Sequence, residues 1–450
     1  MKSRSNMEQQ PIDRWLINPV SQFITNTTAS GKVLFGSALA ALVLSNSPWS
    51  EEFHHIWEHH FSIGYDEYVI SNDLHHWIND GLMAIFFFVV GLELKREIIA
   101  GELSNLRKAM LPLAAAVAGM AVPATVYLLF NAGTETARGW GIPMATDIAF
   151  ALGILYLLGD RVPLSLKVFL TALAVADDLG AVLVIALFYT SEISLQSLLI
   201  GGFFMTVLIV ANIIGVRSTV FYGIVGIGGL WLAFLLSGVH ATIAAVLAAF
   251  TIPARGTIRD ERFASKIRLL IGDFDKASKS NSRLVSDDQL HVIEDIRAHA
   301  LAALTPLQRL EHALHPLVSF IIMPVFALAN AGVSLSADSL SLGNSTVTFG
   351  VALGLLVGKV VGVVGIVTIL VKLRIAELPT GIGWRQVLGL GFLASVGFTM
   401  SLFISNLAFS TPEAITQAKL GILGASFVGG LAGYFILRST SNASGVKQAG

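Results

Sequence analysis

Cysteine is absent from the 450 residues, and charged residues are scarce. Without cysteine the chain forms no disulfide, no thiolate metal site and no thiol nucleophile. Asp, Glu, Lys and Arg make up 13% of the residues, about half of their share in soluble domains. So few charges could hardly cover a soluble surface, which excludes soluble enzymes, disordered proteins and coiled coils. The net charge of −1 provides no basic field, so we expect no nucleic-acid partner.

Apolar residues dominate instead. They make up 54% of the chain, beside 42 glycines, and the mean hydropathy is +0.72. A helix needs about 20 apolar residues to cross a bilayer. The apolar runs predict an all-α polytopic membrane protein with about twelve transmembrane helices, near 30–48, 76–98, 110–131, 140–158, 164–189, 196–215, 219–235, 239–252, 307–330, 348–371, 386–407 and 416–437. The seventh and eighth runs are short, so each is either a tilted or an incomplete crossing.

The positions of Lys and Arg predict the orientation of these helices. No Lys or Arg lies between Lys32 and Lys95, and alternate loops carry 26 of the 29 basic residues. Cytoplasmic loops carry the excess of basic residues in membrane proteins. Both termini are therefore predicted to be cytoplasmic, and the number of spans to be even.

The same pattern divides the chain into five segments. They are a cytoplasmic N-terminal segment at 1–28, a membrane domain at 29–252, a cytoplasmic insert at 253–305, a membrane domain at 306–437 and a cytoplasmic tail at 438–450. The first segment lacks the apolar core of a cleavable signal peptide. We therefore expect the first span itself to direct the chain to the membrane.

The insert at 253–305 is mostly polar. Ser286 with Gln289 indicates a capping box that opens an amphipathic helix, and Thr305 followed by Pro306 and Gln308 indicates a second cap at the ninth span. The insert is expected to be a solvated linker with one surface helix. The alternative is a regulatory or partner-binding segment.

Four charged residues stand out deep in otherwise apolar sequence within the predicted spans: Asp147, Asp177, Asp178 and Lys359. Charges in a membrane helix are costly and mark functional sites by default. Adjacent helical residues point about 100° apart, so one aspartate of the pair can face a water-filled cavity while the other contacts a neighbouring helix. A coupled pair that holds a proton near neutral pH can exchange it for a small hard cation, which prefers oxygen ligands. Lys359 is the natural countercharge, and the alternative is an ion-pair cluster that only fixes helix packing.

Two spans resemble helices that are broken at mid-membrane. Pro143, small residues and the Thr146–Asp147 pair interrupt the apolar sequence in GIPMATDIAFALG. A similar pattern occurs in the eleventh span, in GFLASVGFTMSLFIS. Broken helices expose dipole ends, which a carboxylate and a cation can balance. The two breaks fall in the middle of spans 3–5 and 10–12, which begin on opposite sides of the membrane. This arrangement predicts inverted repeats and a secondary transporter with a site at the midplane.

Seven segments, in order along the chain, carry a family resemblance: FFFVVGLELKREIIAGEL, MATDIAFALG, ALAVADDLGAV, SGVHAT, RLEHALHP, FALANAGVSL and GFTMSLFI. They resemble the NhaA family of bacterial Na⁺/H⁺ antiporters, from about residue 29 to 437. The resemblance implies twelve helices with the fourth and eleventh broken and crossing. It also implies pH-regulated, electrogenic exchange of cytoplasmic Na⁺ or Li⁺ for protons across the inner membrane, for sodium and pH homeostasis, with no cofactor and no enzymatic activity.

The resemblance also implies roles for individual residues. Asp178 would be the main cation ligand and Asp177 its partner, paired with Lys359 when no cation is bound. Asp147 with Thr146, and Lys359, would compensate the facing helix ends. The residues of the pH response would be Glu93, Glu97, His240, Glu311, His312 and His315.

The same residues have ordinary interpretations. Glu93 and Glu97 lie one helical turn apart and could form the acidic rim of a cation funnel. The alternative is that Glu97, beside Lys95 and Arg96, belongs to an ordinary interfacial charge cluster. His240 is either a sensor or a packed histidine. For the group around Glu311 the choice between sensing and an ordinary role stays open.

The first predicted outer loop contains HHIWEHH, with its histidines at His54, His55, His59 and His60. The spacing could hold Zn²⁺ on a helix, and the alternative is a solvated loop. The following FSIGYDEYVISN alternates like a hairpin. In the NhaA family this loop forms part of a homodimer contact, so the resemblance implies a homodimer.

Three other functions compete with the antiporter. An intramembrane aspartyl protease needs facing aspartates on two helices, and the chain has adjacent ones and no GxGD motif. A channel needs a symmetric filter rather than a proton-exchanging pair beside a buried lysine. A transporter of the same fold could instead move an organic anion with sodium, and flux assays in vesicles distinguish these functions.

Overall fold

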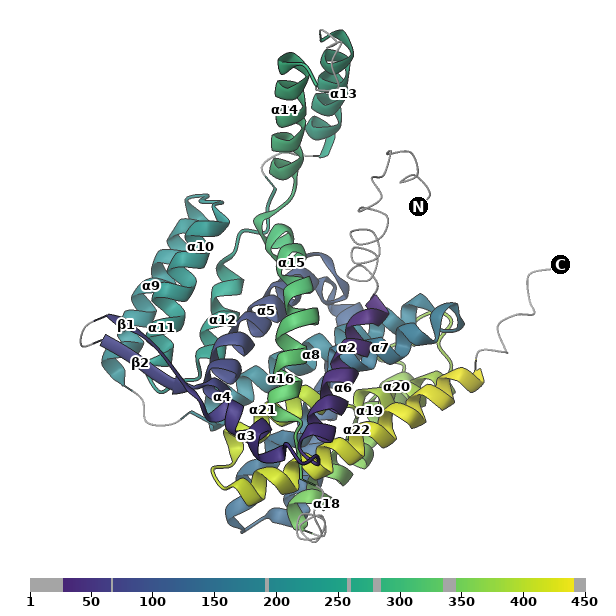
Figure 1. The fold of residues 1–450 in the computed structure, drawn as a ribbon. Coiled ribbons are helices and arrows are strands. Elements are labelled where there is room, and N and C mark those ends of the chain that lie inside the picture. Colours follow the sequence, from purple (N-terminus) through teal and green to yellow (C-terminus); the bar gives the residue numbers. More distant parts are fainter. Residues whose placement is uncertain are drawn as a thin grey trace, which may run out of the picture.

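The computed structural model describes residues 27–65, 68–190, 194–256, 260–277, 285–334 and 345–440. Helices make up almost all of the regular structure in this part of the chain, and two strands form one hairpin (Figure 1). The prediction of an all-α fold is therefore confirmed. The predicted terminal segments at 1–28 and 438–450 lie almost entirely outside the described residues.

Seven helical segments among the described residues are long and apolar enough to cross a membrane. They lie in α6 (Leu106–Asn131), η4–α7 (Glu135–Met144, Ile148–Leu157), α8 (Leu164–Phe188), α9 (Leu195–Ile213), α15–η7–α16 (Pro306–Leu317, Val318–Ile322, Met323–Asn330), α18–η8–α19 (Thr346–Leu353, Gly354–Lys359, Val360–Lys372) and α22 (Pro412–Thr440). A bent pair adds an eighth: α20 (Trp384–Ala394) and α21 (Phe398–Ala408), which meet at 41°. The protein is therefore polytopic.

The other predicted spans correspond to shorter or more charged helices. They are α2 (Thr27–Leu44), η2–α5 (Trp77–Leu82, Met83–Ala100), α10–η6–α11 (Thr219–Val225, Gly226–Trp231, Leu232–Leu235) and α12 (Ala241–Thr251). The predicted short seventh and eighth runs are α10–α11 and α12. The total of twelve crossings stays a prediction.

Both predicted breaks are present. The chain is extended at Ala145 and Asp147 between η4 and α7, and it leaves helical geometry between α20 and α21. The two breaks touch, because the Asp147 N–H donates to the Val396 carbonyl over 2.7 Å. Gly397 permits this approach, because a Cβ added there would lie 2.8 Å from the Ala145 carbonyl oxygen. The crossing therefore lies inside the helix bundle.

The membrane helices pack in two groups. The first, called the crossing group here, consists of α6, η4, α7, α8 and the segments from α18 to α22. The second, the flanking group, consists of η2–α5, α9, α10–α11, α12 and α15–α16, with α9 to α12 gathered on one side (Figure 1). Helix α2 contacts α7 in one group and α16 in the other. The crossing group contains both chain breaks.

The first loop contains α3 (Ser50–Glu58), a short α4 (Leu74–His76) and a hairpin. Strand β1 (His60–Tyr65) pairs antiparallel with β2 (Tyr68–Asp73), so the predicted hairpin is confirmed. His54 and His55 lie on α3, so this part of the loop is helical. All four histidines are exposed, which agrees with the alternative of a solvated loop. No three His, Asp or Glu side chains in the described ranges could hold a metal ion, so the structure does not support the zinc hypothesis.

The insert contains two helices rather than the one expected. Helix α13 (Asp260–Lys276) packs against α14 (Asp287–Ala303), and this pair projects beyond the ends of α12 and α15 (Figure 1). Ser286 caps α14 by accepting from the Gln289 N–H, which is one half of the predicted capping box. Thr305 forms a complete capping box with Gln308. Helix α13 was not predicted, because its apolar residues, such as Ile267 and buried Leu270, are interspersed with charged residues.

Two glycines let α19 and its preceding η8 turn approach α6 closely. A Cβ added at Gly362 would lie 2.5 Å from the Ala118 carbonyl oxygen, and one at Gly358 would lie 2.7 Å from Pro123 Cα. Lys359 lies between these glycines in sequence. The close approach thus places the lysine backbone against α6, while Gly365 on the same helix has nothing within 4 Å of an added Cβ.

We expect Gly362→Ala to lower the thermal unfolding midpoint of the purified protein in detergent. The added methyl group meets backbone, and overpacking of this kind costs about 1–3 kcal/mol. Gly365→Ala is the matched control, because alanine is favoured over glycine in a helix interior by about 1 kcal/mol and meets nothing there. Equal shifts of the two midpoints would contradict this account of the helix contact.

Candidate functional site

Asp147, Asp177, Asp178 and Lys359, the four charged residues predicted deep in the spans, all lie at the crossing. Asp177 and Asp178 lie in the middle of α8, Asp147 is the residue before α7, and Lys359 ends η8. Their side chains are at most 1% exposed. The tertiary fold therefore brings together residues that are up to about 200 positions apart in the sequence.

Asp177 has two side-chain partners, and both contact the same carboxylate oxygen. Its Oδ2 forms an ion pair with Lys359 Nζ and accepts a hydrogen bond of 2.6 Å from Thr146 Oγ1. Both side chains of the ion pair are fully buried. A buried pair stabilises a fold poorly, because desolvation offsets much of its attraction. The pair therefore needs an explanation other than packing.

Asp178 is different from its neighbour. Neither of its carboxylate oxygens has a hydrogen-bond partner among the described residues, although the residue is 1% exposed. Its electrostatic neighbours are Asp177, Asp147, Glu93 and Lys359. An isolated buried carboxyl group has a large desolvation cost. Asp178 therefore has two carboxylate oxygens available as ligands inside a buried, mostly acidic cluster.

Asp147 joins the N-termini of two half-helices. Its Oδ1 accepts from the Phe150 N–H at the start of α7, over 3.0 Å. Its Oδ2 accepts from Thr399 at the start of α21, from the backbone N–H over 3.0 Å and from Oγ1 over 2.6 Å. Helix N-termini carry partial positive charge and favour a carboxylate. One side chain therefore serves both exposed helix starts.

The facing carbonyl ends have their own partners. Lys359 Nζ donates to the carbonyl of Met144, the last residue of η4. Thr146 Oγ1 lies 2.9 Å from the carbonyl oxygen of Ala394, the last residue of α20. Partial negative charge gathers at such ends. Lys359 therefore donates to one of the two ends at which the chain leaves its helices. The Thr146 hydroxyl lies at the other end, with its single proton between the Ala394 carbonyl and Asp177.

A second polar cluster lies where α5 meets α15. Arg96 forms an ion pair with Glu311, and its Nη2 lies 3.2 Å from Glu97 Oε1. Glu93 lies close enough to all three to interact with them electrostatically. Of the predicted pH-response residues, the structure gathers Glu93, Glu97 and Glu311 here.

The three histidines of the predicted pH response lie differently. His312 and His315 are exposed on α15, next to Glu311 in sequence. His240 is at the start of α12, where its Nε2 lies 2.8 Å from the Tyr189 carbonyl oxygen. The structure therefore does not bring His240 together with the Glu311 cluster.

Two contact residues escaped the sequence analysis. Thr399 was not singled out, because a threonine in GFTMS carries no charge and its role depends on a partner 252 positions away. Arg96 was noted only as an interfacial charge, although it pairs with Glu311. The repeated Thr beside each break was the available signal for Thr399.

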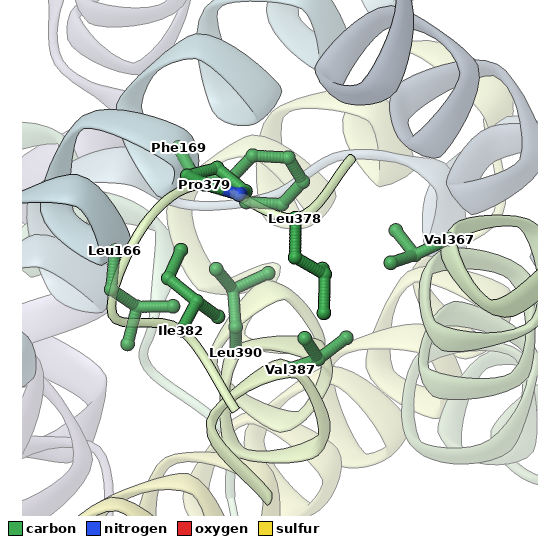
Figure 2. A pocket seen from close by; sticks show the side chains of 8 residues that line it. All are labelled: Leu166, Phe169, Val367, Leu378, Pro379, Ile382, Val387 and Leu390. Atoms are coloured by element: carbon green, nitrogen blue, oxygen red, sulfur yellow. The ribbon is translucent and has the colours of Figure 1, made fainter. Parts of the chain in front are cut away.

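An apolar pocket lies away from these clusters. Leu166 and Phe169 of α8, Val367 of α19, and Leu378 and Pro379 of the following loop contribute to its lining (Figure 2). Its remaining lining residues are Ile382, Val387 and Leu390. A lining without a polar side chain cannot hold an ion. The pocket is a packing gap below the 373–383 loop and not part of the candidate site.

Comparison with known proteins identifies the family. The family model described as Na⁺/H⁺ antiporter 1 matches residues 21–437. A protein of Oleidesulfovibrio alaskensis named Na(+)/H(+) antiporter NhaA is 52% identical over 430 residues, 95% of each chain. A protein of Acidithiobacillus ferrooxidans with the same name is 48% identical over 433 residues, 96% of this chain and 99% of the relative. The resemblance predicted from seven segments is therefore confirmed, and the chain belongs to the Na⁺/H⁺ antiporter family that includes these NhaA proteins.

Proposed function

We propose that this chain is an electrogenic antiporter that exports cytoplasmic Na⁺ or Li⁺ in exchange for protons across the bacterial inner membrane. Asp178 binds the cation, and Asp177 with Lys359 couples cation binding to proton release. The single observation that carries this proposal is the contrast between the two aspartates. One is held by Lys359 and Thr146, and the other has no hydrogen-bond partner in the described part of the chain.

The exchange follows from competition for the same oxygens. A proton and a small hard cation both bind carboxylate oxygen, and one buried carboxylate holds them in turn. Positive charge that arrives at Asp178 also acts on Asp177 and weakens its pairing with Lys359. The ammonium group then loses part of its stabilisation in a low-dielectric site and releases a proton. One proton from Asp178 and one from Lys359 per monovalent cation give net inward charge.

The cluster around Glu311 supports a proposal for pH regulation. Glu93 is an electrostatic neighbour of Asp178 and also of Glu311 and Arg96. A change in the charge of this cluster therefore acts on the cation site through Glu93. We assign the pH response to Glu93, Glu97, Glu311, His312 and His315 on this basis, and we retain His240 as a separate candidate.

We also propose an architecture with more membrane crossings than the eight candidate spans found in the described residues. It consists of twelve crossings in two inverted repeats of three helices, with both termini in the cytoplasm and a homodimer formed through the first loop. The two crossed breaks, η4–α7 and α20–α21, support the repeats. The exposed apolar side chains of the β hairpin, Phe61, Ile63 and Val69, support a contact with a second copy.

The direct test is cation-dependent collapse of a pH gradient in vesicles that contain the purified chain. We expect collapse with Na⁺ and Li⁺ in the wild-type chain, and none with either ion in Asp178→Asn, which keeps the shape but removes the charge. Asp273→Asn, on exposed α13, is the matched control and should behave as the wild type. Normal Na⁺-driven proton movement in Asp178→Asn would refute the assignment.

Lys359 provides a second, independent test. Lys359→Gln is expected to be inactive or to lose electrogenicity, and Lys359→Arg, which does not readily deprotonate, to be impaired in proton coupling. Each net charge moved through 100 mV contributes about 2.3 kcal/mol to the cycle, so the loss is measurable as transport current on a supported membrane. A fully active and electrogenic Lys359→Gln variant would make Lys359 a structural countercharge only.

A further inference from the structure

Three asparagines from three helices form a hydrogen-bonded row away from the cation site. Asn406 Nδ2 on α21 donates to Asn330 Oδ1 on α16 over 2.6 Å, and Asn330 Nδ2 donates to Asn79 Oδ1 on η2 over 3.1 Å. Asn330 is fully buried and Asn79 is 8% exposed. Buried amides are costly unless paired, so this row specifies how the three helices meet.

The row joins the two groups of helices. Asn406 belongs to the crossing group, whereas Asn330 and Asn79 belong to the flanking group. Two more contacts link the groups on the same predicted outer side: Lys419 Nζ of α22 lies 3.5 Å from the Gly332 carbonyl oxygen, and His240 Nε2 lies 2.8 Å from the Tyr189 carbonyl oxygen. The groups are therefore held together by polar contacts at this end.

Aromatic side chains fill the interface one turn deeper. Phe403 precedes Asn406 by three residues on α21, and Phe326 precedes Asn330 by four residues on α16. The ring of Phe403 lies 6.3 Å from that of Phe326 and 5.4 Å from that of Phe87 on α5, measured between centroids. All three rings are fully buried. The amide row thus covers an apolar seal between the outer side and the crossing.

We propose that Asn79, Asn330 and Asn406 form a latch that keeps the outer passage to the cation site closed. This inference rests on the proposed function, because only a transporter that exposes its site to each side in turn needs such a closure. Transporters of this kind move one bundle against the other around a fixed site. The latch and the aromatic seal lie where the two groups must separate for the site to face outward.

The chemistry of the amide suits a contact that must break in every cycle. In the closed state each amide pairs with another, and the interface stays dry. When the groups separate, water replaces the lost partners, so the open state leaves no orphaned polar group. The charged side chains of an ion pair at this position would attract or repel a passing cation. Amides are neutral, so they leave the passage free of fixed charge.

The absence of cysteine from the natural chain makes the test direct. Met83 is fully buried and lies between Asn79 and Phe87 along η2–α5, so Met83→Cys reports whether the passage beneath the latch is open. The reporter is combined with Asn406→Leu, which removes the amide donor at similar volume. The rate of labelling by a membrane-impermeant maleimide is measured in right-side-out vesicles, and cation-driven proton exchange is measured on the same preparations.

Asn131→Leu in the same reporter background is the matched control. Asn131 is also fully buried and donates from Nδ2 to the carbonyls of Tyr127 and Thr346, over 3.2 and 3.0 Å. Its partners lie within the crossing group, so its loss removes buried amide bonds without releasing the flanking group. If Asn406→Leu does not reach the membrane, Asn406→Ala removes the same donor with less bulk and gives the same comparison.

We expect the labelling rate to rise about tenfold with Asn406→Leu, which corresponds to about 1.4 kcal/mol, and to stay near the reporter rate with Asn131→Leu. An unchanged rate with Asn406→Leu would overturn the latch, and so would an equal rise in both variants, which indicates general loosening. Failure of the proposed function is detected in a different measurement. In that case the Met83→Cys chain, in which all three asparagines are intact, shows no cation-driven proton exchange.

Discussion

Helix ends inside a bilayer impose the constraint on which the rest of this structure depends. The hydrocarbon core offers no water to backbone groups, so each interrupted helix needs partners for its free N–H and C=O groups. Here two interruptions cross and satisfy one another, with Asp147 on two helix starts and with Lys359 and Thr146 on two helix ends. The crossing therefore decides where charges can be placed in the membrane domain.

The placement of those charges separates the roles of two adjacent aspartates. Asp177 faces the crossing, where Lys359 and Thr146 already bind it, and Asp178 points about 100° away along the same helix. A buried ion pair beside a carboxylate without a hydrogen-bond partner is a poor way to stabilise a fold, which supports our proposal that the pair couples cation binding to proton release. The glycines that bring η8–α19 against α6 keep Lys359 in reach of this site.

The sequence predicts the features that depend on local chemistry. Adjacent aspartates in an apolar run, a proline near a Thr-Asp pair and capping residues each act through neighbours in the chain, and the breaks, the β hairpin and the caps of α14 and α15 were found in this way. Contacts between distant segments are not encoded locally. Helix packing creates the contact of Thr399 with Asp147, the ion pair of Arg96 with Glu311 and the row of asparagines. The apolar face of α13 was not recognised, because charged residues are interspersed along that segment.

Proton release on cation binding tests the central claim most directly. Purified protein in weakly buffered detergent solution receives Na⁺ at constant ionic strength, and the pH change is recorded while Na⁺ binding is measured by calorimetry. The account predicts proton release that saturates together with Na⁺ binding and that is absent when choline replaces Na⁺. Saturable Na⁺ binding without proton release would contradict the exchange of cation and proton at one buried site.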